Sequence, residues 1–275
     1  MSIPLKYDSD GNVLEGSKPV IILGSNGSGK TRFGLQLASW NSAETIAALR
    51  NIALEENIPM QSLAQAEQEL TNHKNLRRKR PWSISSEINN LFAKLMAEDS
   101  AAAIDFRERY QSGITKPETT NLMRLQKSWQ LLFPGRHITF KGYTPKVTSE
   151  YVAGETDYPA QSMSDGERVA LYLAGRVLDA SPGIIVVDEP EVHFHSRLAI
   201  QFWDELERLR ADCRFVYITH DLTFARSRDT DDYLIVRPGK QPELINTGSG
   251  IPSDVAEDIL SAASFSIFAD RLIFC

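Results

Sequence analysis

The sequence predicts an α/β protein with a mainly parallel sheet and an inserted lobe of helices. Two continuous apolar runs, residues 184–187 and 215–218, are typical of strands that helices cover on both faces. An earlier apolar run, residues 19–23, ends at a glycine-rich turn, after which the spacing becomes helical. Residues 43–132 are rich in Ala, Leu, Glu, Gln and Lys and contain almost no glycine, which favours several helices of modest length.

Composition excludes several classes of protein. The chain has 275 residues, of which 30 are Lys or Arg and 36 are Asp or Glu, so the net charge is −6. That balance excludes a basic nucleic-acid coat, and a hydrophobic content of 42% excludes a disordered acidic tail. Two cysteines exclude a disulfide scaffold, and no apolar run reaches the roughly 20 residues of a membrane span. We therefore expect a globular cytoplasmic protein without a membrane partner.

A phosphate-binding loop follows the first buried strand. The pattern G-x-x-x-x-G-K-[ST] is the P-loop, or Walker A, motif, and it lies here between a predicted strand and a predicted helix. Glycines let the backbone approach phosphates, the lysine reaches the β- and γ-phosphates, and the threonine hydroxyl binds Mg²⁺. The motif predicts ATP and Mg²⁺ as cofactors, and the alternative is a glycine–serine turn of no function. Its residues are Gly24, Ser25, Asn26, Gly27, Ser28, Gly29, Lys30 and Thr31.

Two acids end the next buried strand. Asp188 follows the apolar run 184–187, so its carboxylate is predicted at the edge of the sheet beside the Mg²⁺, as a second metal ligand with Thr31. Glu189 is adjacent and is predicted to polarise the attacking water as a general base. The alternative is a strand end with two solvated acids, which the upstream phosphate loop disfavours.

A third motif identifies the kind of ATPase. Residues 162–168, Ser-Met-Ser-Asp-Gly-Glu-Arg, resemble the signature L-S-G-G-Q of ABC-type ATPases, and a helical run follows them. Ser164 and Gly166 are kept, whereas Met163, Asp165 and Glu167 depart from the pattern. Taken alone, this segment is equally a helix N-cap with acids in its first turn. The order and spacing of all the motifs favour the signature, whose serine contacts a γ-phosphate.

A histidine completes the resemblance. His220 follows the apolar run 215–218 and lies 32 residues after Asp188. In ABC-type ATPases a switch histidine at such a strand end contacts the γ-phosphate, and a histidine in a surface loop is the alternative.

The segment 188–195, Asp-Glu-Pro-Glu-Val-His-Phe-His, resembles the AAA-like branch of ABC ATPases, which includes the OLD (overcoming lysogenization defect) family. The form of the phosphate loop resembles SMC- and RecF-like ATPases. This resemblance covers residues 17–40 and 135–240. It implies one ATPase domain over residues 1–275, with a mixed sheet, a strand-rich nucleotide lobe and a helical insert at about 43–132. It also implies a head-to-tail dimer in which Ser164 of one copy completes the phosphate site of the other.

The function that this resemblance implies is ATP hydrolysis that controls the activity of another protein or domain. The leading hypothesis is an ATPase that dimerises with nucleotide and controls a nuclease or another nucleic-acid effector, in phage defence or DNA repair. One alternative is the ATP-binding subunit of an ABC transporter. The other alternative is a scaffold that binds ATP and turns it over slowly, against which the presence of Glu189 argues.

Three further features carry weaker predictions. A basic segment could contact DNA or RNA phosphates, bind an acidic protein, or form a solvated face. His193 and His195 form an H-x-H pair, for which a structural or dimer-contact role is favoured over zinc. Residues 265–275 resemble the opening strand of a TOPRIM-like nuclease domain, and a strand of the ATPase sheet is the alternative. The basic residues are Lys74, Arg77, Arg78, Lys79 and Arg80.

Overall fold

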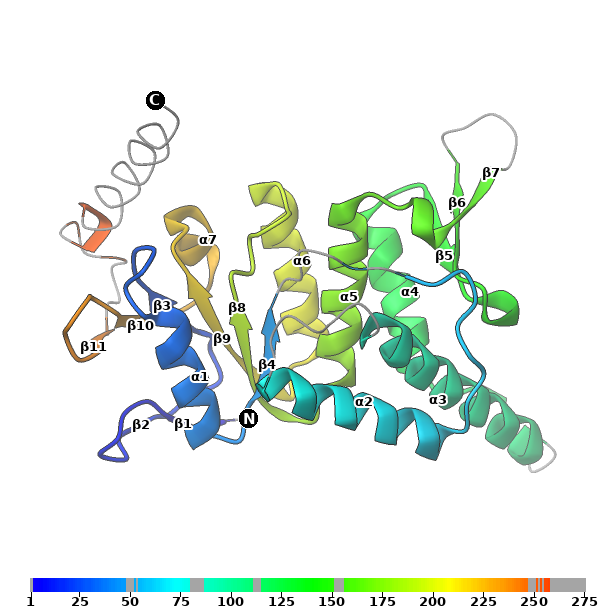
Figure 1. Cartoon of the computed structure of the whole chain (residues 1–275), viewed down its shortest axis with the longest axis horizontal. Coiled ribbons are helices and arrows are strands. Elements are labelled where there is room, and N and C mark those ends of the chain that lie inside the picture. The colour runs from blue at the N-terminus through cyan, green and yellow to red at the C-terminus, as the bar shows by residue number, and fades with distance from the viewer. Residues whose placement is uncertain are drawn as a thin grey trace. The chain divides into compact units, whose positions relative to one another are not determined.

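The computed structural model describes residues 2–47, 52, 54–79, 87–110, 115–150, 156–246, 251, 253 and 255–257. The chain divides into two compact units (Figure 1). Unit 1 consists of residues 1–48 and 180–275, and unit 2 consists of residues 49–179.

Unit 1 is built on a six-stranded sheet with the order β11-β10-β3-β9-β8-β4. Five of these strands are parallel, and only β11 pairs in the antiparallel direction. This arrangement confirms the predicted α/β fold with a mainly parallel sheet. The strands are β3 (Val20–Leu23), β4 (Glu44–Ala47), β8 (Gly183–Asp188), β9 (Cys213–Thr219), β10 (Asp232–Ile235) and β11 (Glu243–Asn246). A two-stranded ribbon, β1 (Leu5–Lys6) and β2 (Val13–Leu14), precedes them.

Helices cover both faces of β9, which explains why every residue of that strand is buried and why residues 215–218 are apolar. Val216 and Ile218 belong to the core that includes Phe33 and Leu37 of α1 (Lys30–Trp40). Alternate residues of a strand point to opposite faces. On the other face, Tyr217 packs edge-on against Trp203 of α6 (Ser196–Leu209). A short helix, α7 (Leu222–Ser227), follows β9.

The described part of unit 2 combines four helices with a small antiparallel sheet of order β5-β6-β7. Its helices are α2 (Leu63–Lys79), α3 (Glu87–Tyr110), α4 (Asn121–Leu132) and α5 (Asp165–Asp179). Its strands are β5 (Arg136–Thr139), β6 (Lys146–Ser149) and β7 (Thr156–Pro159), and its 3-10 turns are η1 (Lys141–Tyr143) and η2 (Ala160–Ser162). A buried ion pair between Glu87 and Arg176 joins α3 to α5.

One strand lies where the sequence predicts helix. The predicted helical segment 43–132 begins with β4, which pairs with β8 at the edge of the unit 1 sheet. Only Thr45 and Ile46 in this strand are β-branched, so local composition gives a weak strand signal, and pairing with β8 decides the conformation. Helices α2, α3 and α4 occupy much of the remaining segment. The single domain over residues 1–275 stays a prediction.

Some predicted features fall outside the described residues. These are Arg80, residues 265–275, and the side chains of the other basic residues at 74–79, whose backbone lies in α2. Within the described part of the chain, no helix has both the length and the apolar character needed to cross a membrane.

Trp203 supports the turn that follows β8, and its removal is expected to destabilise unit 1. The indole is fully buried and its Nε1 donates a hydrogen bond of 3.0 Å to the carbonyl oxygen of Pro190. We expect Trp203→Ala to lower the free energy of unfolding by about 3–5 kcal/mol, because it leaves a large cavity. Trp203→Phe keeps most of the ring and loses the hydrogen bond, so we expect a loss of about 1 kcal/mol. Urea unfolding measures both, and equal losses would contradict the role of the Nε1 donor.

Candidate functional site

The loop of residues 24–29 joins β3 to α1 and leaves the start of that helix open to a ligand. Gly29 precedes α1 with φ 93°, and no side chain caps the helix. A helix N-terminus without a side-chain cap offers its first N–H groups to an anion. At the start of the loop, a Cβ on Gly24 would lie 2.6 Å from the carbonyl oxygen of Val236, so only glycine fits there. Both features suit a backbone that wraps around phosphates.

Lys30 lies almost buried under this loop. Its side chain is 6% exposed, and its Nζ lies 3.2 Å from Oδ1 of Asn26 and 4.0 Å from Oε1 of Glu189. A buried ammonium needs partners because it has lost its hydration. One neutral oxygen and one distant carboxylate satisfy it only partly, so the group retains the capacity to bind an anion.

Thr31 and Asp188 meet across the site. The Thr31 hydroxyl donates a hydrogen bond of 3.4 Å to Oδ1 of Asp188, which ends β8. Burial raises the pKa of Asp188 above its ordinary value. A hydroxyl and a carboxylate are hard oxygen ligands of the kind that Mg²⁺ prefers. Together with the open start of α1 and the ammonium of Lys30, these residues fit a nucleotide phosphate with Mg²⁺.

Glu189 is held in an uncommon backbone conformation. Its φ is 51°, a value that non-glycine residues rarely adopt, and its N–H donates a hydrogen bond of 2.8 Å to the carbonyl oxygen of Ile218. This geometry turns its carboxylate toward Lys30 and toward His220, whose Nδ1 lies 3.7 Å from Oε1 of Glu189. Unit 1 therefore brings together five of the predicted residues: Lys30, Thr31, Asp188, Glu189 and His220.

A second glutamate joins this cluster, and the sequence did not identify its place. Glu191 is 11% exposed, and its Oε1 accepts a hydrogen bond of 2.6 Å from Oγ1 of Thr219. The same Oε1 lies 3.7 Å from Nδ1 of His220. Burial raises the pKa of Glu191 to about 7. The sequence signal that could have located Glu191 is its position two residues after Glu189, in a turn that also contains Pro190.

Ser164 and Gly166 lie in unit 2, at the start of α5. The Ser164 hydroxyl and N–H each donate a hydrogen bond of 2.8 Å to Oε2 of Glu167, and the N–H of Glu167 donates back to the Ser164 hydroxyl. This reciprocal arrangement is a capping box. The other oxygen of Glu167 pairs with Arg136 of β5. The cap alternative is thus present in the structure, and the signature role of Ser164 and Gly166 stays a prediction.

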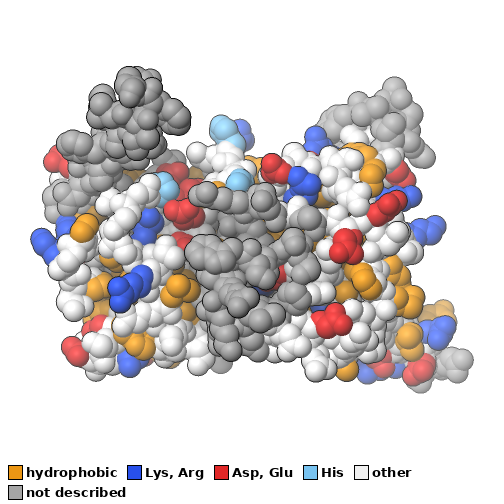
Figure 2. All heavy atoms as spheres, in the orientation of Figure 1, with side chains coloured by type: hydrophobic (Ala, Val, Ile, Leu, Met, Phe, Trp, Pro, Cys, Tyr) orange, Lys and Arg blue, Asp and Glu red, His pale blue; other side chains and the backbone are white. Residues whose placement is uncertain are grey.

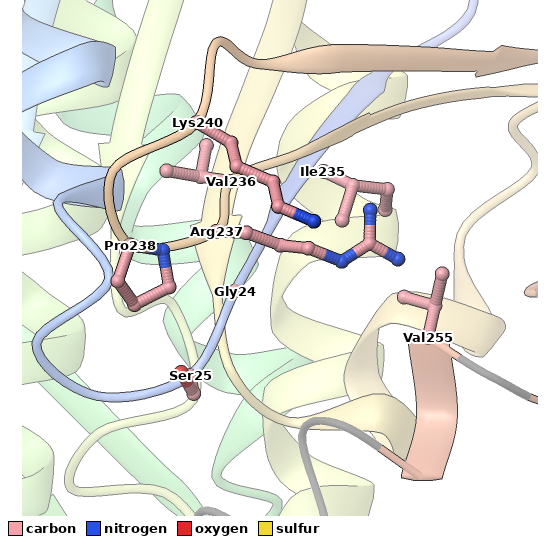
Figure 3. Close-up of a pocket in the computed structure, with 8 residues that line it drawn as sticks. All are labelled: Gly24, Ser25, Ile235, Val236, Arg237, Pro238, Lys240 and Val255. Atoms are coloured by element: carbon pink, nitrogen blue, oxygen red, sulfur yellow. The ribbon is translucent and has the colours of Figure 1, made fainter.

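A pocket of about 290 Å³ adjoins the first residues of the phosphate loop (Figure 3). The turn after β10 supplies two cations to it, Arg237 and Lys240, of which Arg237 also pairs with Glu243 at 2.8 Å. These cations increase the positive potential beside Gly24 and Ser25. The pocket is lined by Gly24, Ser25, Ile235, Val236, Arg237, Pro238, Lys240 and Val255.

His193 and His195 are both exposed on the turn between β8 and α6. Among the described residues, no group of three or more His, Cys, Asp or Glu side chains is arranged to hold a metal ion. The structural or dimer-contact role of this pair stays a prediction.

Charge on the surface is mixed. On the face that Figure 2 shows, the Lys and Arg side chains of the described residues are interspersed with Asp and Glu side chains. With a net charge of −6, such a surface gives no broad positive field over the described residues in this view. A nucleic-acid contact on this face would therefore be local.

The parallel sheet, the loop between β3 and α1, and the acids that follow β8 together define a P-loop ATPase head of the ABC- and SMC-like class. A family model described as "AAA domain, putative AbiEii toxin, Type IV TA system" matches residues 37–226, which is more than half of the chain. The chain belongs to this family, which confirms the predicted ATPase class. The comparison with curated proteins finds no match.

Solved structures include similar ATPase heads. An SMC head bound to the C-terminal winged-helix domain of ScpA is 10% identical, with a TM-score of 0.48, over 89% of this chain and 97% of that chain. The Pyrococcus furiosus Smc head with an extended coiled coil is 15% identical, with a TM-score of 0.36, over 74% of this chain and 54% of that chain. A dimeric ATP-binding cassette bound to ADP and Pi is 14% identical, with a TM-score of 0.38, over 88% of this chain and 95% of that chain.

Burial of Glu191 predicts a pH dependence of stability. Because its folded pKa of about 7 exceeds its ordinary value of 4.5, the folded state binds more protons than the unfolded state between these pH values. Stability therefore falls as pH rises through that window. The glutamine in Glu191→Gln does not ionise, so this variant should not lose stability as the pH rises. We expect its free energy of unfolding to match that of the wild type near pH 5 and to exceed it by roughly 2–3 kcal/mol near pH 8.

Urea unfolding of the nucleotide-free protein across this pH range measures the effect. Glu118→Gln is the matched control, because the Glu118 side chain is 83% exposed. Parallel pH profiles for the wild type and Glu191→Gln would contradict the burial argument.

Proposed function

We propose that the chain binds ATP with Mg²⁺ at residues 24–31, hydrolyses it, and switches by nucleotide-dependent dimerisation. The observation that carries this proposal is the convergence of Lys30, Glu189 and His220 at the edge of the sheet where the phosphate loop begins. A cation for phosphate, a carboxylate for water and an imidazole within a few ångströms of one another are the groups that phosphoryl transfer to water requires.

Each residue has a separate task in this proposal. Lys30 binds the β- and γ-phosphate oxygens, and Asn26 orients its ammonium. Glu189 accepts a proton from the attacking water as the general base. His220 donates to the γ-phosphate and so registers its presence. Thr31 and Asp188 would hold Mg²⁺, which when bound neutralises charge on the phosphates.

Dimerisation would complete the site. In the proposed head-to-tail dimer, Ser164 and Gly166 of one copy contact the γ-phosphate held by the other. The Ser164 hydroxyl would then turn from Glu167 to the phosphate, because it has a single proton to donate. Hydrolysis removes the contact, and the copies separate.

We further propose that this switch controls a nuclease or another nucleic-acid effector, in phage defence or DNA repair, within the cytoplasm. Two observations support this assignment: the resemblance of residues 188–195 to OLD-type ATPases, and the toxin named in the description of the family. The basic residues at 74–80 are the proposed local contact for DNA or RNA. Adding DNA or RNA to the ATPase assay tests that link, since a nucleic-acid effector predicts stimulation.

Two variants test the catalytic assignment. We expect Glu189→Gln to reduce the rate of ATP hydrolysis by at least about 100-fold while ATP binding is retained, because the base is lost and the phosphate contacts are kept. We expect Lys30→Ala to abolish ATP binding. Phosphate release and titration with a fluorescent ATP analogue measure the two quantities. Equal, negligible hydrolysis by the wild type and Glu189→Gln would identify a scaffold instead of an enzyme.

A mixing experiment tests the composite site. Lys30→Ala and Ser164→Ala should each be inactive alone. A mixed dimer retains one intact site, formed by Lys30 of the Ser164→Ala copy and Ser164 of the Lys30→Ala copy. We expect the equimolar mixture to recover up to about half of wild-type hydrolysis, since each mixed dimer has one of its two sites intact. A mixture as inactive as its components would contradict the head-to-tail arrangement.

A further inference from the structure

We propose that Glu191 is a positioning residue that pairs with Nδ1 of His220 and holds the imidazole with its Nε2 toward the γ-phosphate. This inference rests on the proposed function, because it assigns His220 the phosphate contact. It concerns a residue that none of the sequence motifs assigns to the site.

Thr219 anchors Glu191 in one orientation. The Thr219 side chain is fully buried, and its Oγ1 accepts a hydrogen bond of 2.9 Å from the N–H of Asp221. Its proton is therefore directed to Oε1 of Glu191, at 2.6 Å. The carboxyl group is thus fixed from one side by the last residue of β9, immediately before His220.

Two buried polar atoms beside this anchor have no hydrogen-bond partner in the described structure. One is Oε2 of Glu191, and the other is Nδ1 of His220. The Nδ1 atom lies 3.7 Å from Oε1 of Glu191, so a small rotation of the imidazole would make a hydrogen bond. Buried polar atoms without partners are unfavourable, which gives these two residues a reason to pair.

Glu191 can hydrogen-bond to Nδ1 of His220 in either of its protonation states. If Glu191 is protonated, its O–H donates to Nδ1 and a neutral imidazole carries its proton on Nε2. If Glu191 is ionised, it accepts from Nδ1–H, and Nε2 then carries a proton only when the imidazole is doubly protonated. Both states of Glu191 orient the ring through the same Nδ1 contact, and burial raises the pKa of Glu191 to about 7.

Two carboxylates lie equally close to Nδ1 of His220. Oε1 of Glu189 and Oε1 of Glu191 are each 3.7 Å away, and Asp221 adds a further negative charge near Glu191. Pairing of Nδ1 with Glu191 leaves the carboxylate of Glu189 free for the attacking water. Without Glu191, Nδ1 of His220 would instead pair with Glu189, the proposed base.

A double-mutant cycle on the full chain tests this role. We expect Glu191→Ala to lower kcat for ATP about tenfold with KM almost unchanged, because the phosphate-binding loop is intact. In Glu191→Gln the amide can still donate to Nδ1, so we expect kcat within about threefold of the wild type and a flatter pH profile. In a His220→Ala background, Glu191→Ala should cause no further loss. Glu118→Gln serves as the surface control.

The opposing outcomes are distinct. If Glu191→Ala lowers kcat as much without His220 as with it, Glu191 acts independently of His220 and the proposal is wrong. A second readout does not need hydrolysis: NMR of the His220 imidazole, assigned with His220→Ala. Glu191→Ala should change the ¹⁵N chemical shift of Nδ1, because its hydrogen-bond partner is removed, and an unchanged chemical shift would overturn the pairing. Absent hydrolysis with a changed Nδ1 chemical shift would reject the proposed function and retain the pairing.

Discussion

The parallel pairing of β3, β9 and β8 is the constraint on which the site depends. Leu23 is paired with Thr219, and Asp188 is paired with Ile218, so the three strands end within one residue of one another. The residue that follows each strand end then lies at the same edge of the sheet. Gly24, Glu189 and His220 are these residues, and a shift of one strand by a single residue would point their neighbours to the wrong face.

The turn after β8 shows how the fold sustains a strained residue. The positive φ of Glu189 is unfavourable by itself, and two contacts hold it. Its N–H bonds to the end of β9, and the following residue, Pro190, accepts a hydrogen bond from the buried indole of Trp203. The orientation of the predicted base is therefore determined by the sheet on one side and by α6 on the other.

Sequence patterns predicted the parts of the site whose positions follow from the local sequence. The phosphate loop, Asp188 and His220 could be located because each follows a buried apolar strand, and the strands give a strong local signal. Glu191 could not be placed, because its role depends on a contact with Thr219, 28 residues away. The strand β4 was missed for a similar reason, since its pairing with β8 outweighs its weak local propensity. Whether Ser164 acts as a cap or as a signature could not be decided from its sequence, because one residue type serves both tasks.

The capping box at the start of α5 gives the free form of the chain a hydrogen bond that the proposed dimer would have to give up. A hydrogen bond contributes about 1 kcal/mol to stability, and a symmetric dimer would lose the bond from the Ser164 hydroxyl to Glu167 in each copy. The sum, about 2 kcal/mol, corresponds to roughly a 30-fold weaker association. In the proposed cycle, the Ser164 hydroxyl would return to Glu167 once the phosphate has left, which would favour dissociation of the dimer.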